Sequence, residues 1–157
     1  MIDRPIIDQA DDSELQRLVE AHPLLFRGTP PSIPSYLSPG WFTLADQLCS
    51  DIERLLGPAC AQFEVLEVKE KFAGLQFGFR MKGCSDEVWE RALDLASRAQ
   101  AASESMCKKC GAPARLHSFD GWLVALCETH ATKRERARQA EALQAMADDA
   151  RRLGLEY

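Results

Sequence analysis

The chain has 157 residues and a formal net charge of −5 at pH 7; 46% of its residues are apolar, 27% are charged and 8% are aromatic. This composition is typical of a globular protein, and it excludes a disordered tail, a collagen-like repeat and a coiled-coil rod. No apolar run approaches the roughly 18 to 20 residues that span a bilayer, and the N-terminus has no apolar leader segment. We therefore expect a cytoplasmic globular protein without a membrane partner.

Charge is distributed unevenly along the chain. Residues 1–100 hold 10 basic and 16 acidic side chains, whereas residues 101–157 hold nine and eight. A domain that binds nucleic acid through its whole surface is basic throughout, so any such contact is expected in the C-terminal third. We expect an acidic α+β domain over residues 1–104 and a second part over residues 105–157, packed on the first as one unit.

The predicted elements of the first part are three helices and one hairpin. Apolar residues at spacings of three and four predict helices from Ser13 to before Pro23, from about Thr43 to Leu56, and from Ser85 to about Ser103. Alternating apolar residues predict two strands, at residues 63–68 and 75–79, joined by a turn at residues 70–74. The small residues of the third helix indicate close packing on this hairpin.

A proline-rich loop is predicted at residues 27–40, because four prolines in that length exclude regular structure. A loop this long inside a compact domain is often functional. Its candidate partner-binding residues are Pro30, Pro31 and Tyr36. The alternative is a rigid strap that covers the core through Ile33, Tyr36 and Leu37.

Four residues near the C-terminus have the spacing of a metal site. Cys107, Cys110, Cys127 and His130 form a C-x2-C-x16-C-x2-H pattern. Two such pairs present four ligands suited to tetrahedral zinc, and Gly111 supplies the permissive backbone that a zinc knuckle needs. We predict one zinc ion with a structural role, because catalytic zinc usually keeps an open position and four protein ligands close this site.

The predicted elements around these ligands follow the order of a treble-clef zinc finger. A hairpin of residues 115–118 and 122–126, with an Asp120–Gly121 turn, is expected between the two pairs. A helix from about Glu128 to Leu153 carries the second pair. The chain is therefore predicted to be α+β: a small β-hairpin/helix domain followed by a treble-clef-like zinc finger with a long C-terminal helix.

The sequence does not offer an assembled catalytic set. His117 lies in the finger hairpin, where nucleases of the His-Asn-His kind carry a catalytic histidine. That chemistry needs a further histidine on the helix, but His130 is already assigned to zinc, and the chain contains no asparagine. His22 is interpreted as a helix-end residue. We therefore expect a protein that is not an enzyme.

The remaining cysteines, Cys49, Cys60 and Cys84, are scattered through the first part of the chain. Cytosolic thiols are kept reduced, and buried free cysteine is a common small apolar residue. We therefore interpret these three as free thiols and expect no disulfide scaffold.

Basic residues surround the zinc motif: residues 105–138 hold seven basic and three acidic side chains. Six of the basic residues are candidate phosphate contacts, namely Lys108, Lys109, Arg115, Lys133, Arg134 and Arg138. The alternative is a solvated surface on which ion pairs at i,i+3 and i,i+4 neutralise much of the charge.

Residues 68–77, with the sequence VKEKFAGLQF, resemble the VKEKFGGLRF stretch of a family of short bacterial and phage proteins. That family continues with a CxxCG knuckle, a GW pair and LCxxH, which correspond here to residues 107–111, 121–122 and 126–130. Two positions differ: Ala73 replaces a glycine, which argues against a left-handed backbone at this turn, and Gln76 replaces an arginine. Some members resemble immunity proteins encoded beside bacterial toxins, so the resemblance implies a toxin-binding role.

The tip of the predicted hairpin holds Lys69, Glu70, Lys71 and Phe72. It is either merely exposed or a partner contact with Phe72 as its aromatic anchor. Acidic partners are suited to cover basic nucleic-acid-processing toxins. We expect a non-enzymatic zinc-containing protein-binding module, most concretely an immunity protein that neutralises a cognate bacterial toxin by occlusion. The alternative is a zinc-finger nucleic-acid-binding regulator of bacterial or phage origin.

Overall fold

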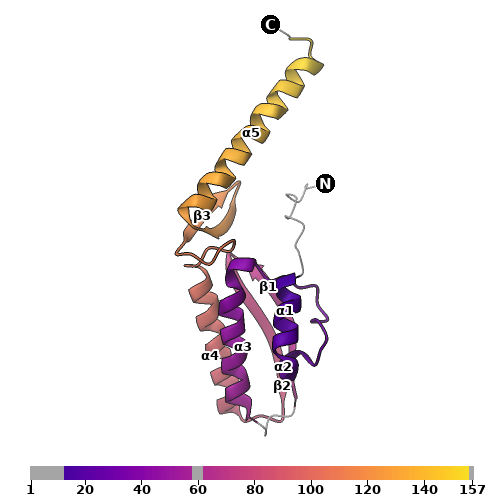
Figure 1. Ribbon diagram of the computed structural model, residues 1–157, viewed down its shortest axis with the longest axis vertical. Helices are drawn as coiled ribbons and strands as arrows, with labels where there is room; N and C mark the ends of the chain where they lie inside the picture. The colour runs from indigo at the N-terminus through magenta and orange to yellow at the C-terminus, as the bar shows by residue number, and fades with distance from the viewer. Residues whose placement is uncertain (1–12, 58–61, 156–157) are drawn as a thin grey trace.

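The computed structural model describes residues 13–57 and 62–155. The elements in chain order are α1 (Ser13–Ala21), α2 (Pro23–Phe26), the 3-10 turn η1 (Pro39–Trp41), α3 (Phe42–Leu56), β1 (Gln62–Lys71), β2 (Gly74–Lys82), α4 (Asp86–Ser103), β3 (Arg115–Phe119), β4 (Trp122–Leu126) and α5 (Glu128–Arg152). The chain is mixed α+β, as the sequence predicts (Figure 1). Among the described residues, no helix combines the length and the apolarity needed to cross a bilayer.

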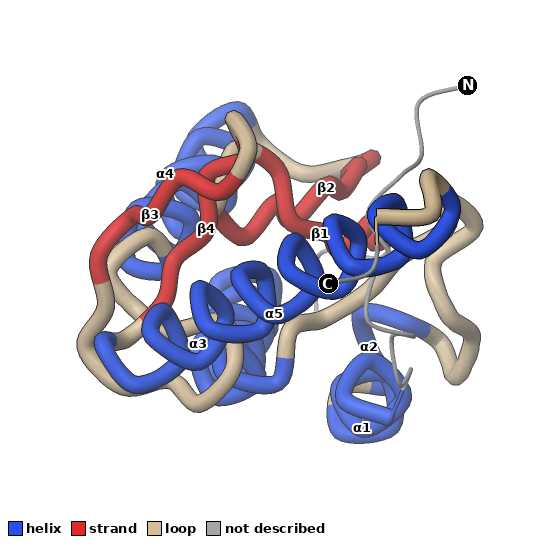
Figure 2. The backbone as a smooth tube through the Cα atoms, turned by 90° about the horizontal axis from the view of Figure 1, so that it is seen from above, coloured by secondary structure: helices blue, strands red, loops and turns tan. Residues whose placement is uncertain are grey.

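Helix α3 lies between α4 and α1 (Figures 1 and 2). It buries Ala45, Leu48 and Ile52, which share one face because they recur at three and four residues. Helix α4 begins at Ser85, whose Oγ accepts a hydrogen bond from the backbone N–H of Val88 at 3.3 Å. This helix packs against α3 and β2, so the hairpin has a helical layer on one face.

Strands β1 and β2 form an antiparallel hairpin, with Lys71 paired to Gly74 at the turn and Gln62 paired to Lys82 at the open end. Alternate residues face the helices, and six of them are buried: Phe63, Val65, Val68, Leu75, Phe77 and Phe79. The rings of Phe63 and Phe79 stack with centroids 5.1 Å apart. Aromatic pairs across strands stabilise a two-stranded sheet that would be marginal alone.

The turn of this hairpin differs from the expectation. Phe72 and Ala73 have φ values of 51° and 65°, so both central residues are left-handed. A two-residue turn with this backbone matches the twist of the flanking strands, which is why it forms without glycine. The replacement of a glycine by Ala73 therefore does not remove the left-handed conformation, and that prediction was wrong.

The proline-rich loop is tied to the edge of β1. The N–H of Tyr36 donates to the carbonyl of Val68 at 2.8 Å, and the N–H of Val68 donates to the Oγ of Ser35 at 2.9 Å. Leu37 is fully buried, whereas the side chain of Ile33 is 42% exposed. The loop is thus a strap on the core; Ile33 holds it through its N–H, which donates to the carbonyl of Leu66 at 3.4 Å, rather than through a buried side chain. A feature not predicted is α2, which begins at Pro23 immediately after α1.

The scattered cysteines have different states. Cys49 is free and buried, as expected. Cys84 is disulfide-bonded, so its interpretation as a free thiol was wrong. The partner of Cys84 is not among the described residues, and the prediction for Cys60 falls outside them as well. A reducing compartment therefore cannot be used as an argument for every cysteine of this chain.

Candidate metal centre

The structure brings the four predicted ligands together. One ligand atom each of Cys107, Cys110, Cys127 and His130 lies within 4.8 Å of the other three. The Nδ1 of His130 is 3.2 Å from the Sγ of Cys127 and 3.5 Å from that of Cys107, and the Sγ atoms of Cys110 and Cys127 are 3.9 Å apart. A tetrahedral zinc with ordinary Zn–S and Zn–N bonds requires ligand separations of about 3.5–3.8 Å. The cluster can therefore hold a metal ion of that size.

Local backbone geometry aims these side chains at one point. Gly111 has a φ of 77°, and its N–H donates to the carbonyl of Cys107 at 2.8 Å, which closes the knuckle. Cys127 is the N-cap of α5, and His130 follows in the first turn of that helix. Strands β3 and β4 form an antiparallel pair in which Arg115 lies opposite Leu126 and Phe119 lies opposite Trp122. This pairing brings the knuckle next to the start of α5.

The knuckle is also docked on the first part of the chain. The N–H of Gly40 donates to the carbonyl of Lys108 at 2.8 Å, and the indole Nε1 of Trp41 donates to the carbonyl of Met106 at 3.0 Å. A Cβ added to Gly40 would lie 2.0 Å from the carbonyl oxygen of Cys107. Only a glycine allows the two backbones to approach this closely. Trp41 is 1% exposed, so the contact is part of the core.

The thiols of the cluster differ in acidity. Burial opposes ionisation of Cys107, but backbone hydrogen bonds from Cys127, Cys110 and Lys109, together with one from the Cys110 thiol, lower its pKa to about 6. The backbone of Ala112 favours ionisation of Cys110, but desolvation and the neighbouring Cys107 and Cys127 outweigh it and raise its pKa. Cys107 is thus a thiolate near neutral pH, whereas a bound cation would favour ionisation of Cys110.

Three of the six candidate phosphate contacts already face carboxylates. Lys108 pairs with Glu70, Arg115 with Glu128 at 3.0 Å, and Arg138 with Asp120 at 2.6 Å. The guanidinium of Arg134 lies 4.7 Å from the ring centroid of Phe119. Lys109 is exposed beside Cys110, and Lys133 is exposed on α5. The predicted basic surface is therefore partly neutralised by neighbouring carboxylates.

The candidate partner-binding residues come from two elements, the hairpin tip and the strap. Phe72 and Lys71 are exposed at the hairpin tip, where the Nζ of Lys71 lies 5.5 Å from the ring of Phe72. Lys69 pairs with Glu67 at 2.9 Å and Glu70 with Lys108, so both side chains are held in place. In the loop, Pro30 is exposed whereas Pro31 and Tyr36 are half-buried.

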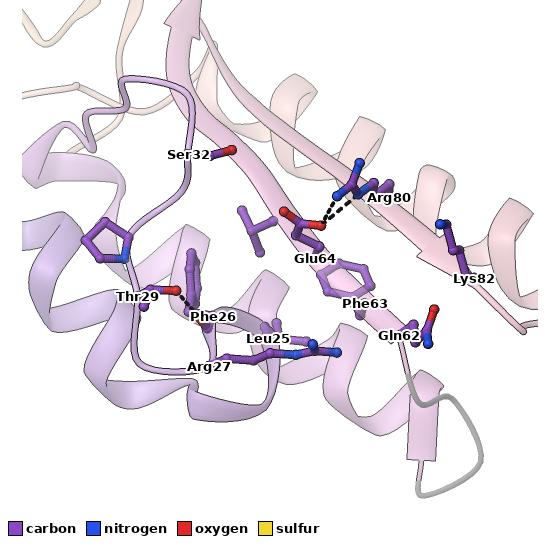
Figure 3. A pocket seen from close by; sticks show the side chains of 12 residues that line it. Leu25, Phe26, Arg27, Thr29, Ser32, Gln62, Phe63, Glu64, Arg80 and Lys82 are labelled. Carbon is purple, nitrogen blue, oxygen red and sulfur yellow. Dashed lines mark hydrogen bonds and ion pairs between the residues drawn. The ribbon is translucent and has the colours of Figure 1, made fainter.

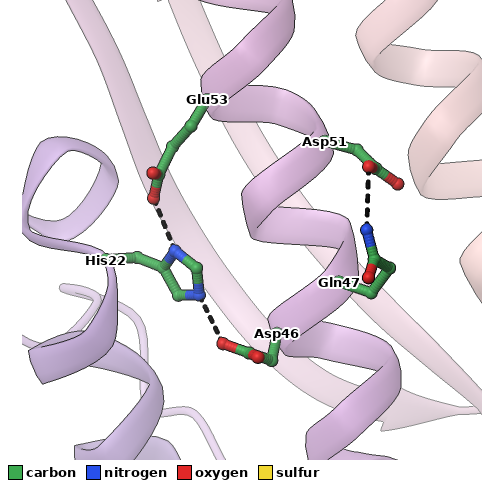
Figure 4. A network of polar contacts seen from close by, with 5 residues as sticks. All are labelled: His22, Asp46, Gln47, Asp51 and Glu53. Carbon is green, nitrogen blue, oxygen red and sulfur yellow. Dashed lines mark hydrogen bonds and ion pairs between the residues drawn. The ribbon is translucent and has the colours of Figure 1, made fainter.

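Sequence reasoning missed a buried cluster around His22. Its Nδ1 lies 2.5 Å from the Oε1 of Glu53 and its Nε2 lies 2.6 Å from the Oδ1 of Asp46 (Figure 4). Each ring nitrogen of His22 thus faces one carboxylate oxygen of α3, which fixes the orientation of the ring. Asp46 and Glu53 are seven residues apart on α3 and so share a face; that spacing was the available signal, but nothing local pointed to His22.

His117 is half-buried in β3, with its Nε2 3.2 Å from the carbonyl oxygen of Leu126. Its ring thus lies against the paired strand of the same hairpin, which is the element on which the sequence places it.

Comparison with protein-family models, with curated proteins and with solved structures gives no match to this chain.

Proposed function

We propose that this chain is a non-enzymatic zinc-containing protein-binding module, and specifically an immunity protein that neutralises a cognate bacterial toxin by occlusion. The observation that carries the proposal is Phe72, whose side chain is 79% exposed while its backbone has a φ of 51°. A bulky residue in the left-handed region costs about 1–3 kcal/mol. The fold gains little from an exposed ring, so the residue is best explained by a contact with a partner.

The surroundings of Phe72 support its role as an anchor. The ion pairs of Glu70 with Lys108 and of Lys69 with Glu67 hold the neighbouring side chains in place. Aromatic residues on a preorganised support lose little conformational entropy on binding and dominate many interfaces. The tip therefore offers a rigid contact rather than a mobile one.

The strap of residues 27–40 supplies a second contact element. Its prolines restrict the free backbone, and the hydrogen bonds of Tyr36 and Ser35 fix its end on β1. The exposed Pro30 and the half-buried Pro31 would meet the partner directly.

The negative charge of the first part of the chain favours a basic partner. The acidic excess over residues 1–100 would attract a basic, nucleic-acid-processing toxin over long distances and speed its association. Added salt should therefore slow association more than it accelerates release.

Zinc is the metal proposed for the Cys107, Cys110, Cys127 and His130 cluster, with a structural role. Metal analysis of protein purified without added metal should find about one zinc per chain. Replacement of one ligand, Cys127→Ser, should abolish that zinc and unfold the finger, because zinc binding is also folding free energy. A folded, metal-free protein with these three thiols freely titratable would contradict this assignment.

Co-expression with the toxin gene beside this gene tests the immunity role. The toxin alone should stop growth, and the wild-type protein should restore it. Phe72→Ala should abolish protection, whereas Trp122→Ala, which removes a 64% exposed aromatic at the tip of the other hairpin, should retain it. If the wild-type protein protects against no neighbouring gene product, the proposal fails; if only Trp122→Ala loses protection, the interface lies on the finger.

A nucleic-acid-binding regulator is the second candidate. The exposed Lys133 and Arg136 on α5 favour it, since neither has a carboxylate partner among the described residues. If this surface binds phosphates, the affinity for DNA or RNA should fall steeply with salt, and the double variant Lys133→Ala/Arg136→Ala should flatten that dependence. A salt-resistant, sequence-specific complex would place this function above toxin binding.

A further inference from the structure

The distal half of α5 carries large apolar side chains that lie in solvent. Leu143, Met146 and Leu153 are 68%, 69% and 71% exposed. Together with Ala147 and Ala150 they recur at three and four residues, so they share one face of the helix, which we call the distal stripe. Figure 1 shows this half of α5 projecting away from the rest of the molecule. A contiguous exposed apolar face of this kind marks an interaction surface.

A hollow of about 500 Å³ between the strap and the open end of the β1–β2 hairpin does not offer a comparable apolar surface (Figure 3). Its leucine, phenylalanine and valine side chains are at most 4% exposed, namely Leu25, Phe26, Phe63 and Val65. At its rim the Nε of Arg80 donates to the Oε2 of Glu64 at 2.7 Å, so these two charges already have a partner. Of the two surfaces, the distal stripe is therefore the one on which an apolar partner gains more by burial.

The distal stripe is on the side of α5 that faces away from the finger hairpin. The guanidinium of Arg134 lies 4.7 Å from the ring centroid of Phe119 in β3. Arg138 pairs with Asp120 at the hairpin turn, at 2.6 Å. Successive residues of a helix are rotated by about 100°, so Leu143, nine residues after Arg134, points about 180° away from it. A partner can therefore reach the stripe without displacing the hairpin.

The stripe has the seven-residue repeat of paired helices. Leu143 and Ala150 occupy one core position of the repeat, and Met146 and Leu153 occupy the other. Toward the start of α5 the same positions are polar, and one of them is held by the exposed Arg136. A charged residue at a core position weakens a helix pair but limits the registers in which it can form. The pattern is thus that of a short, weak and specific pair.

Charges beside the stripe favour a second copy of this chain in parallel orientation. One flank is acidic and holds Glu128, Glu135 and Asp149. The opposite flank is basic and holds Lys133 and Arg151. In a parallel pair related by a two-fold axis along the helices, the acidic flank of each copy faces the basic flank of the other, and Glu128 lies beside Lys133 of the second copy. An antiparallel pair would instead place like charges together.

We propose that α5 pairs with α5 of a second copy of this chain as a short, parallel, two-stranded coiled coil. Helix α5 has 25 residues. Two helices of this length in contact bury roughly 1,000 Å² in total, which is near the lower limit for a specific interface. We expect a dissociation constant of about 10–100 μM, so the chain is monomeric at low micromolar concentration, where α5 adds little to its stability. The pairing goes beyond toxin binding and involves neither Phe72 nor the strap.

Sedimentation equilibrium of the full-length protein, with zinc added, tests this pairing. Between about 1 and 500 μM the mean mass should rise from that of one chain toward that of two. Leu143→Glu should raise the dissociation constant at least about tenfold, because it buries two carboxylates that face each other. The control, Ala145→Glu, adds the same charge on the opposite face of α5 and should leave the constant unchanged. Both positions are exposed in the single chain, so both variants remain folded.

Two further changes test the core positions and the orientation of the helices. Arg136→Leu should strengthen the dimer about tenfold, because it removes a charge from a core position. Lys133→Glu should weaken the dimer about fivefold, because it faces Glu128 of the second copy. The double variant Glu128→Lys/Lys133→Glu should restore the affinity, since it reverses the pair. In an antiparallel dimer these two positions would not meet.

Three outcomes would overturn the pairing through the distal stripe: a mass of one chain at about 500 μM, a wild-type dissociation constant in Leu143→Glu, or an equal loss of affinity in Ala145→Glu. A weaker dimer in Arg136→Leu would also do so, because that residue would then stabilise the interface. A double variant that stays as weak as Lys133→Glu would show that the helices are not parallel, and the proposal would fail on that ground.

Discussion

Phe72 and Ala73 share a left-handed backbone but differ in what their side chains contribute. Ala73 is 2% exposed, so burial of its methyl group offsets part of the strain. Phe72 is 79% exposed and receives no such compensation. The strain at this turn is therefore concentrated on one side chain that the fold does not need.

Phe72→Gly should accordingly raise the free energy of unfolding by about 0.5 to 1 kcal/mol, because glycine adopts this backbone without a Cβ clash. Phe72→Leu is the matched control: it keeps the strain and should show no gain. Urea unfolding followed by circular dichroism measures both. A loss of stability in Phe72→Gly would show that the ring stabilises the fold.

The buried thiol of Cys49 makes the stability of the folded state depend on pH. Desolvation, followed by the charges of Glu53 and Asp46, raises the pKa of this thiol far above its ordinary value of 9.0. The folded state keeps the proton that the unfolded state releases, so the contribution to stability is complete below pH 9 and is lost as the pH rises above it. The slope is about 1.4 kcal/mol per pH unit.

We therefore expect the stability difference between the wild type and Cys49→Ala to be constant below pH 8 and to narrow above about pH 9. Urea unfolding at a series of pH values measures it, and the comparison cancels the titration of other groups. Parallel stability curves up to pH 10.5 would contradict the assignment of this effect to Cys49.

The segment from Ser38 to Trp41 is the element that joins the knuckle to the helices. The N–H of Gly40 and the indole of Trp41 bond to the backbone carbonyls of Lys108 and Met106, so both of these hydrogen bonds are accepted by the backbone of the second part. Backbone contacts of this kind depend on a small residue at the point of closest approach.

Gly40→Ala should thus lower the free energy of unfolding by about 3 kcal/mol, since its Cβ would overlap the carbonyl of Cys107. Ser38→Ala is the control in the same segment: the Oγ of Ser38 is buried without a hydrogen-bond partner among the described residues, so its removal should be neutral or stabilising. Equal losses of stability in the two variants would contradict this prediction, because they would show that any substitution in the segment is destabilising.

Helix α5 is a long element that is almost entirely exposed. It has 25 residues, of which Ala131 alone is buried, and it projects away from the rest of the molecule in Figure 1. Salt bridges between neighbouring turns, such as Arg151 with Asp148 at 3.3 Å, stabilise it locally. Its distal half adds little to the remainder of the fold.

Removal of residues 141–157 should therefore change the free energy of unfolding of the remaining chain by less than about 1 kcal/mol. Far-ultraviolet circular dichroism should show the loss of helix, and thermal unfolding should show a nearly unchanged midpoint. A large fall in the midpoint would mean that the distal half of α5 packs on a surface in solution.

For the whole molecule, the metal site and the core are coupled through Trp41. If the proposed zinc ion is bound, its removal by a chelator should loosen the knuckle, expose Trp41 and lower the stability of the helices as well as of the C-terminal part. Tryptophan fluorescence should shift to longer wavelength and the unfolding midpoint should fall, and added zinc should reverse both changes. An unchanged midpoint with the zinc removed would show that the two parts are energetically independent.

Much of this fold and of the metal site could be predicted from the sequence, because the signals are local. The apolar spacing within α3 and α4, the alternation along β1 and β2, and the pattern of Cys107, Cys110, Cys127 and His130 all reside within a few turns of chain. Local backbone geometry then converts sequence spacing into ligand geometry.

Contacts between residues far apart in the chain follow from the packing of the elements and not from local sequence patterns. His22 lies between Asp46 and Glu53, and Gly40 lies against Cys107, 67 residues later in the chain. No local sequence pattern indicates that His22 meets these carboxylates or that Gly40 meets the knuckle. Such contacts depend on the packing of whole elements, where burial outweighs the local preference of each residue. For this reason local sequence patterns predict most of the elements and the four candidate ligands, whereas the packing of the elements sets their linkage and the ion pairs that partly neutralise the basic surface.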